Sequence, residues 1–135
     1  KITDRRILDA MGSIPRERFV PSGKEEFAYA DVDIPCAAGR CLMAPMAVAR
    51  LIQEAEIKAE DAVLCVGAGT GYAVSVLAQL ADSVIALESD PACCKTAGEL
   101  FSELSFDNAV LVEGELRRGW DKESPYDVIF IDTKL

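Results

Sequence analysis

Hydrophobic positions along the chain follow two different patterns, which change at about residue 60. In the first part, apolar residues recur at the spacing of a helix face, which predicts helices over residues 4–14 and 45–55. Between them, the proline-rich residues 15–46 predict an irregular segment with short extended pieces. We therefore expect residues 1–60 to form a helical and loop cover over the active site.

From residue 61 onward, short apolar runs alternate with stretches of helical spacing. The runs predict strands at residues 62–66, 83–87, 108–112 and 126–131, with helices at 72–81 and 91–104. Strands that are apolar throughout are typical of a parallel sheet buried on both faces. Their alternation with helices implies right-handed crossover connections. The chain is therefore predicted to be an α/β protein, with residues 61–135 as its core and one structural domain overall.

A glycine-rich loop connects the first predicted strand to the next helix. Its glycines permit a tight turn and let a ligand approach bare backbone. In the dinucleotide-binding fingerprint, a third glycine follows the second after three residues, and here that position is Tyr72. The G-x-G-x-G spacing instead resembles motif I of S-adenosylmethionine-dependent methyltransferases. The residues of this motif are candidate cofactor contacts: Gly67, Ala68, Gly69, Thr70 and Gly71.

Two acidic residues follow the second and third predicted strands. Glu88 lies 21 residues after Gly67, where a carboxylate can accept hydrogen bonds from both hydroxyls of a ribose. Glu115 follows the third strand, at the position where such methyltransferases hold the adenine edge. Together with the glycine loop, these residues predict a site for S-adenosylmethionine, with an NAD-dependent oxidoreductase as the weaker alternative.

The composition narrows the functional classes. A net charge of −9, from 23 acidic against 14 basic residues, repels phosphate and anionic lipid, so nucleic acid and membrane surfaces are not expected partners. No apolar run reaches the roughly 18 residues of a membrane span. The chain has no histidine, which excludes a hydrolase with the usual triad. Its five cysteines form no C-x-x-C pair, so we expect no disulfide framework, no metal site and a cytoplasmic location.

Four short segments resemble landmarks of the protein-L-isoaspartate O-methyltransferase family. Residues 14–21 are similar to its V-P-R-x-x-F-V-P, and residues 28–31 to its A-Y-x-D. Residues 119–120 and 125–127 resemble its G-W and P-[FY]-D. The resemblance implies a Rossmann-like methyltransferase fold whose parallel strands lie in the order 3-2-1-4. It also implies S-adenosylmethionine as methyl donor and isoaspartyl carboxylates of proteins or peptides as acceptors, in a protein-repair reaction.

The chain departs from this family in the loop before the second helix. The family has T-I-S-x-P there, and this sequence has Cys41 and Met43 at the threonine and serine positions. Hydroxyl groups can donate hydrogen bonds to the acceptor carboxylate, whereas a thioether has no donor and a thiol is a weak one. Isoaspartyl methylation is therefore expected to be weak. The alternatives are a protein that binds S-adenosylmethionine without this activity or with another acceptor, and a Met43 that only lines an apolar wall.

The sequence stops directly after the fourth predicted strand. The methyltransferase fold that it resembles has seven strands, so we expect the chain to be incomplete, with its C-terminal strands missing. Without a further neighbour, the apolar strand at residues 126–131 would present an open hydrogen-bonding edge. Self-association through this edge is therefore a further expectation.

Overall fold

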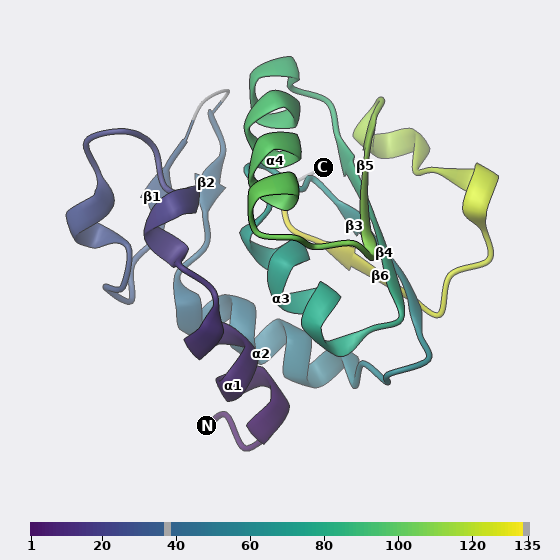
Figure 1. Ribbon diagram of the computed structural model, residues 1–135, viewed down its shortest axis with the longest axis horizontal. Coiled ribbons are helices and arrows are strands. Elements are labelled where there is room, and N and C mark those ends of the chain that lie inside the picture. The colour runs from purple at the N-terminus through teal and green to yellow at the C-terminus, as the bar shows by residue number, and fades with distance from the viewer. Residues whose placement is uncertain (37–38, 134–135) are drawn as a thin grey trace.

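A computed structural model of the chain describes residues 1–36 and 39–133. Within these residues, the centre of the fold is a parallel sheet in the order β5-β4-β3-β6 (Figure 1). Its strands are β3 (Ala62–Val66), β4 (Ser83–Glu88), β5 (Ala109–Glu113) and β6 (Val128–Ile131). Each neighbouring pair is parallel, so the predicted 3-2-1-4 order of the main sheet is confirmed.

Side chains alternate between the two faces of this sheet. From β3, Val63 and Cys65 point into the larger apolar cluster, to which the helices contribute. Leu64 and Val66 point to the opposite face, where they pack with Leu87 and with the segment that follows β5. Both faces are therefore covered, which explains why the central strands are apolar throughout.

The helices lie together on one side of the sheet (Figure 1). They are α1 (Arg5–Ser13), α2 (Pro45–Ala55), α3 (Tyr72–Leu80) and α4 (Pro91–Glu103). The Asp90 side chain caps α4 by accepting a hydrogen bond from the backbone N–H of Cys93 at 3.1 Å. The predicted helices are therefore confirmed, with ends that differ by about one residue. No helix in the described part of the chain combines the length and the apolar character of a membrane span.

Between α1 and α2, the chain is irregular, as predicted. Its described residues include the short 3₁₀ helices η1 (Arg16–Phe19) and η2 (Glu25–Phe27) and the antiparallel strand pair β1 (Ile34–Pro35) and β2 (Cys41–Leu42). A small apolar cluster of Val20, Ala28 and Ile34 holds these pieces together. The segment ends at α2, and its last residues reach the carboxyl edge of the main sheet.

The N-terminal cover and the α/β core share one apolar interior. Ile7, Phe19 and Ile52 from the cover are each at most 1% exposed and belong to the same cluster as Val74 and Leu77 of α3. Burial of this kind stabilises a protein by about 1.5–3 kcal/mol for each large apolar side chain. The cover is therefore a structural part of the core and not a separate appendage.

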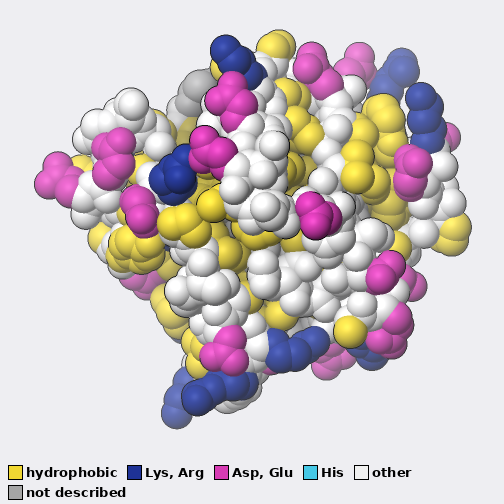
Figure 2. Space-filling model, viewed as in Figure 1, with side chains coloured by type: hydrophobic (Ala, Val, Ile, Leu, Met, Phe, Trp, Pro, Cys, Tyr) yellow, Lys and Arg dark blue, Asp and Glu magenta, His cyan; other side chains and the backbone are white. Residues whose placement is uncertain are grey.

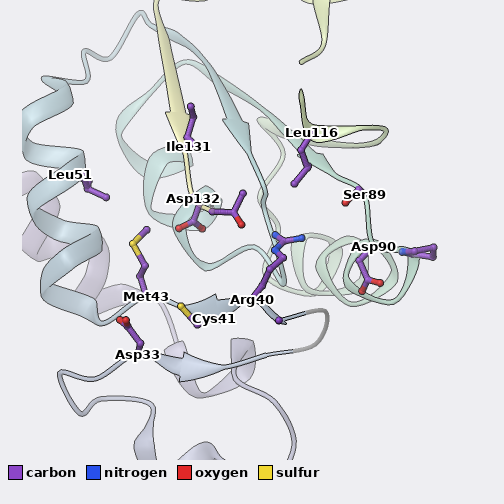
Figure 3. A pocket seen from close by; sticks show the side chains of 13 residues that line it. Asp33, Arg40, Cys41, Met43, Leu51, Ser89, Asp90, Leu116, Ile131 and Asp132 are labelled. Atoms are coloured by element: carbon purple, nitrogen blue, oxygen red, sulfur yellow. The ribbon is translucent and has the colours of Figure 1, made fainter. Parts of the chain in front are cut away.

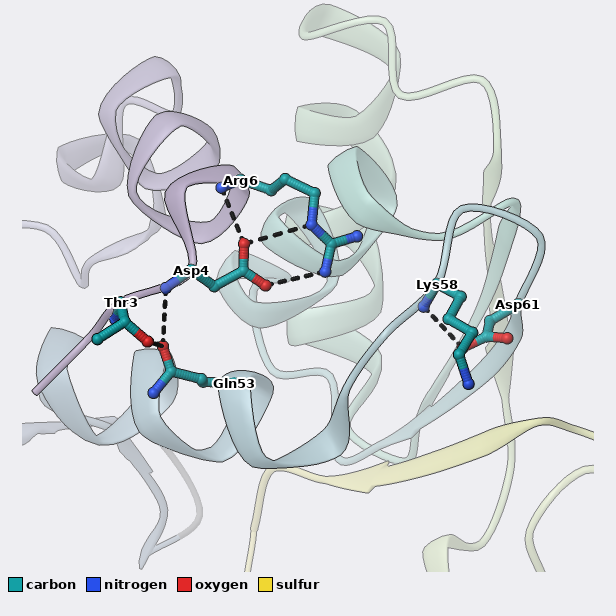
Figure 4. Close-up of polar contacts among 6 residues, drawn as sticks. All are labelled: Thr3, Asp4, Arg6, Gln53, Lys58 and Asp61. Carbon is teal, nitrogen blue, oxygen red and sulfur yellow. Dashed lines mark hydrogen bonds and ion pairs between the residues drawn. The ribbon is translucent and has the colours of Figure 1, made fainter.

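Polar contacts fix the start of α1 against α2 (Figure 4). The Asp4 carboxylate caps α1 by accepting from the backbone N–H of Arg6 at 3.0 Å. The Gln53 side-chain oxygen accepts from the backbone N–H groups of Thr3 and Asp4, at 2.8 and 3.0 Å. One side-chain oxygen on α2 thus binds the two backbone N–H groups that directly precede α1.

The segment between β5 and β6 differs from the prediction. Two 3₁₀ turns form there, η4 (Leu116–Arg118) and η5 (Asp121–Glu123), and the strand begins at Val128 instead of residue 126. The Tyr126 hydroxyl donates to the backbone carbonyl of Trp120, so Tyr126 belongs to the packed loop and not to the ladder. The predicted strand was therefore too long at its start.

Charged groups are dispersed over the surface. Figure 2 shows acidic and basic side chains interspersed over the face seen there, with apolar side chains exposed near β5. Val110 of β5 is 52% exposed. On this face, the charged side chains are therefore dispersed and are not gathered in one patch.

Candidate functional site

The glycine loop lies at the carboxyl end of β3 and is tied to β4. The backbone N–H groups of Gly67 and Ala68 both donate to the Leu87 carbonyl, at 2.9 and 3.1 Å. Gly67 has φ +81° and Gly69 has φ +60°, a region that favours glycine. These bonds hold the loop beside the last residue of β4.

The five loop residues have different roles. A Cβ on Gly67 would lie 2.4 Å from Cγ2 of Thr133 and 3.4 Å from Nη2 of Arg40, and a Cβ on Gly71 would lie 2.5 Å from the Phe101 ring. Ala68 is buried, and the Thr70 hydroxyl donates to the backbone carbonyl of Phe19 at 2.6 Å. Gly67 and Gly71 are buried as well, so half-buried Gly69 is the glycine of this loop that a ligand can approach.

Glu88, the last residue of β4, is 0% exposed and points back at the glycine loop. Its Oε1 accepts from the backbone N–H of Gly69 at 2.6 Å. Its Oε2 accepts from the backbone N–H groups of Ser89 and Asp90, both at 2.8 Å. Burial by itself raises the pKa of Glu88, but hydrogen bonds from Arg40 and from these backbone groups outweigh it and leave the pKa below its ordinary value. Glu88 is therefore a buried carboxylate that stays ionised.

Arg40 is the partner of Glu88, and the sequence analysis missed it. Its Nη1 donates to Oε2 at 2.6 Å and its Nη2 to Oε1 at 2.7 Å, a pair of parallel hydrogen bonds. The signal available in the sequence was a basic residue between Gly39 and Cys41, inside the loop that departs from the family pattern. Nothing in that spacing indicated a contact with a residue 48 positions away.

A pocket of about 800 Å³ opens beside this ion pair (Figure 3). Arg40, Cys41 and Met43 line one side of it, and the end of β6 with Asp132 lines another. Ser89, Asp90 and Pro91, at the start of α4, complete the wall near Glu88. The loop that carries Cys41 and Met43, the candidate acceptor loop, and the residues that follow Glu88 therefore meet at one pocket.

The structure places Cys41 and Met43 at this pocket, as expected for residues of the acceptor loop (Figure 3). Met43 is half-buried and packs against the main apolar core. Its backbone carbonyl accepts from Nη2 of Arg16 at 2.9 Å. The thioether thus contributes an apolar wall and no hydrogen-bond donor.

Arg16 is a buried residue that fixes the acceptor loop from beneath. It is 1% exposed, and its guanidinium carbon lies 4.5 Å from the centre of the Tyr72 ring. Burial lowers the pKa of Arg16 from its ordinary value, against smaller opposing contributions. The sequence analysis used this arginine only as part of a family landmark, and its contact with Met43 is a tertiary feature.

Asp132, directly after β6, is a second acid of the pocket that the sequence analysis did not select. Its backbone N–H donates to the Val66 carbonyl at 2.9 Å, which continues the pairing with β3. Burial raises the pKa of Asp132 to about 7, although Arg40 and Arg16 act in the opposite direction. No cluster of metal-ligating side chains forms among residues 1–36 and 39–133.

Glu115 lies away from the other candidate residues. It is exposed, and its carboxylate pairs with Nε of Arg118 at 3.2 Å. Its neighbour Leu116 lines the pocket instead. The role of Glu115 at an adenine edge therefore stays a prediction, without support from its present side-chain direction.

The fold and its glycine loop define a class of proteins, and similarity to known sequences then defines the family. An open parallel sheet with a glycine loop after its first strand and an acid at the end of the next is typical of α/β proteins that bind nucleotides or nucleosides. A profile of the family "Protein-L-isoaspartate(D-aspartate) O-methyltransferase (PCMT)" matches residues 1–134. The chain belongs to this family.

Individual relatives agree with the family match. Protein-L-isoaspartate O-methyltransferase 2 of Anaeromyxobacter sp. (strain Fw109-5) is 38% identical over 134 residues, which cover 99% of this chain and 55% of the relative. The protein-L-isoaspartate O-methyltransferase of Protochlamydia amoebophila (strain UWE25) is 36% identical over 96% of this chain and 62% of its own length. A solved protein-L-isoaspartate O-methyltransferase superposes with a TM-score of 0.85 at 26% identity, over 95% of this chain and 43% of that one. The chain thus spans little more than half the length of the curated relatives that it matches.

Proposed function

We propose that the chain binds S-adenosylmethionine at the carboxyl ends of β3 and β4 and takes part in methyl transfer to a carboxylate of the isoaspartyl type. The observation that carries the proposal is Glu88, a fully buried and ionised carboxylate aimed at the glycine loop. Membership of the family supports the same activity. Because the relatives are longer, the activity is proposed for the whole protein of which this chain forms the matching part.

Residues of the site fit this donor. The bare backbone at Gly69 would admit its nucleoside part, and the Glu88 oxygens would accept hydrogen bonds from the ribose hydroxyls. The donor supplies a methyl group on a sulfonium. Backbone N–H groups of Ser89 and Asp90 hold the Glu88 carboxylate in place, so its direction does not depend on the ligand.

The acceptor side of the site suits a group that needs no base. A carboxylate is ionised at neutral pH, so it can attack without proton removal, in agreement with a chain that has no histidine. Hydrogen-bond donors would still be needed to orient it, and Cys41 and Met43 provide few. Weak isoaspartyl turnover therefore belongs to the proposal. Binding of the donor with another acceptor is the second candidate, favoured by the packing of Met43 against the core.

Calorimetry and a transfer assay test the two parts of the proposal. S-Adenosylmethionine is expected to bind and NAD is not, and Glu88→Gln is expected to abolish the preference for adenosine over 2′,3′-dideoxyadenosine. Methanol release from an isoaspartyl peptide, with the matching normal aspartyl peptide as control, reports transfer to a carboxylate. Tight binding of NAD would contradict the donor assignment. Donor binding without methanol release would support the second candidate.

The environment and assembly of the protein are also part of the proposal. Cys65 and Cys94 are buried thiols outside any disulfide, as in a reducing cytoplasm. Strand β6 pairs with β3 on one side, and no other strand in the described ranges pairs with its far side. Ile129 and Ile131 of β6 are 59% and 47% exposed. We propose that this edge mediates self-association of the chain in solution.

A further inference from the structure

The Glu88 carboxylate has no acceptor capacity left for a ribose. A carboxylate offers about four lone-pair sites on its two oxygens. Here the two oxygens receive five hydrogen bonds, two from the Arg40 guanidinium and three from backbone N–H groups. Ribose hydroxyls can therefore reach these oxygens only after some of the present donors leave.

The guanidinium is the group that can leave. The three backbone donors belong to the glycine loop and to the start of α4, so their movement would disturb the fold. Arg40 reaches Glu88 through a long side chain that is 19% exposed, whereas the Glu88 side chain is 0% exposed. The pocket also holds carboxylates of Asp33, Asp90 and Asp132, which offer other partners to a displaced guanidinium.

The guanidinium borders the glycine loop on the side of Glu88. Its Nη2 is 3.4 Å from the place of a Cβ on Gly67 and 4.0 Å from that of a Cβ on Gly69, and the Thr133 side chain lies nearer to the Gly67 position, at 2.4 and 2.9 Å. Arg40 thus occupies the acceptor oxygens of Glu88, which are the atoms that ribose hydroxyls would need.

We propose that Arg40 is a built-in competitor of the methyl donor, which must release Glu88 before the donor's ribose can bind there. The inference rests on the proposed function, because it takes a ribose as the ligand of Glu88. After the release, the backbone N–H groups of Gly69, Ser89 and Asp90 still donate to the Glu88 carboxylate and keep its direction. The apparent affinity for the donor is then reduced by the fraction of molecules in which Arg40 has left, so Arg40 sets the donor concentration that fills the site.

Calorimetry with two nucleosides tests the exchange. Arg40→Met keeps a long side chain but removes the donors, and it is expected to tighten adenosine binding by about 10- to 100-fold. Binding of 2′,3′-dideoxyadenosine, which has no hydroxyl to take the place of the guanidinium, is expected to change less than about twofold. Arg40→Lys keeps the charge without the paired geometry and is expected to fall between wild type and Arg40→Met.

A matched control is Arg18→Met, the same change at an exposed arginine that pairs with Glu103 outside the pocket, which should leave both affinities unchanged. Urea unfolding of each variant shows whether it is folded. If Arg40→Met is not folded, the comparison of Arg40→Lys with wild type provides the test. One outcome would overturn the competition between Arg40 and the ribose but leave the proposed function standing. In that outcome, the Arg40 variants bind adenosine no more tightly than wild type does, and they still prefer adenosine to the dideoxy analogue. Loss of that preference in wild type and variants alike would overturn both.

Discussion

Replacing Gly71 with alanine is expected to lower the free energy of unfolding by about 2–5 kcal/mol. Gly71 has φ +101°, and a Cβ built there would lie 2.5 Å from Cε1 and 2.8 Å from Cζ of Phe101. The Phe101 ring is 6% exposed and belongs to the main core, so it has little room to move. The substitution therefore forces α3 and α4 apart where the glycine loop ends and α3 begins.

Two contributions make up this magnitude. A left-handed backbone costs a non-glycine residue roughly 1–2 kcal/mol. Overpacking in a dense core adds roughly 1–3 kcal/mol. Gly23→Ala separates the two, because Gly23 has φ +89° and no described atom lies within 4 Å of its Cβ position. Gly23→Ala should therefore show only the backbone contribution, about 1–2 kcal/mol.

Urea unfolding followed by circular dichroism measures both variants against wild type, with linear extrapolation to water. The loss for Gly71→Ala is expected to exceed the loss for Gly23→Ala by at least about 1 kcal/mol. Equal losses would refute the reasoning, because they would show that the Phe101 ring moves aside at no cost. A variant too unstable to purify would agree with the expected direction, and its unfolding could then be measured in stabilising osmolyte.

Four further predictions concern the pocket and the sheet edge. Glu88→Ala should destabilise the protein by about 1–3 kcal/mol in urea, because the backbone N–H groups of Gly69, Ser89 and Asp90 lose their acceptor, whereas the exposed Glu113→Ala should change stability by less than about 0.5 kcal/mol. Asp132 has its pKa raised to about 7 from an ordinary 3.8, so its contribution to stability is full below about pH 4 and is lost as the pH rises through 7. Asp132→Asn should remove that part of the pH dependence, at most about 1.4 kcal/mol per pH unit, and identical slopes for the two proteins would contradict it. Met43→Ser should raise methanol release from an isoaspartyl peptide by about tenfold or more, since it restores a donor, and an unchanged rate would show that the position is only a wall. Ile129→Lys should shift the sedimentation coefficient toward the monomer, and a wild type that is already monomeric at high concentration would rule out the edge contact.

The sheet was predictable because its signals are local. Continuous apolar runs give β3 and β4 their positions, and burial on both faces follows because the residues between the ends of each strand are all apolar. The 3₁₀ turns after β5 have no such periodicity, and Tyr126 reads as strand in sequence although its hydroxyl binds the loop at Trp120. The sequence pattern around an apolar residue is the same whether that residue packs against a loop or pairs in a sheet.

The site was predictable in part, for the same reason. Gly67, Gly69 and Glu88 occupy fixed positions relative to their strands, so spacing alone placed them at one end of the sheet, where Gly69 donates to Glu88. Arg40 and Asp132 reach the pocket from other elements, and their contacts depend on how those elements pack. Strand position also predicted Glu115, but it cannot tell whether a side chain at a strand end turns inward or toward solvent.

The shared interior of cover and core has a consequence for the order in which the protein can be made. Synthesis releases the N-terminus first, so α1 leaves the ribosome before α3, whose side chains it packs against. Until α3 emerges, Ile7 and Ala10 can pack only against α2, and an isolated nine-residue helix is marginal in water. We therefore expect the cover to acquire its full structure only when the glycine loop and α3 have been synthesised. The acceptor loop held by Arg16 over Tyr72 is completed at that same late moment.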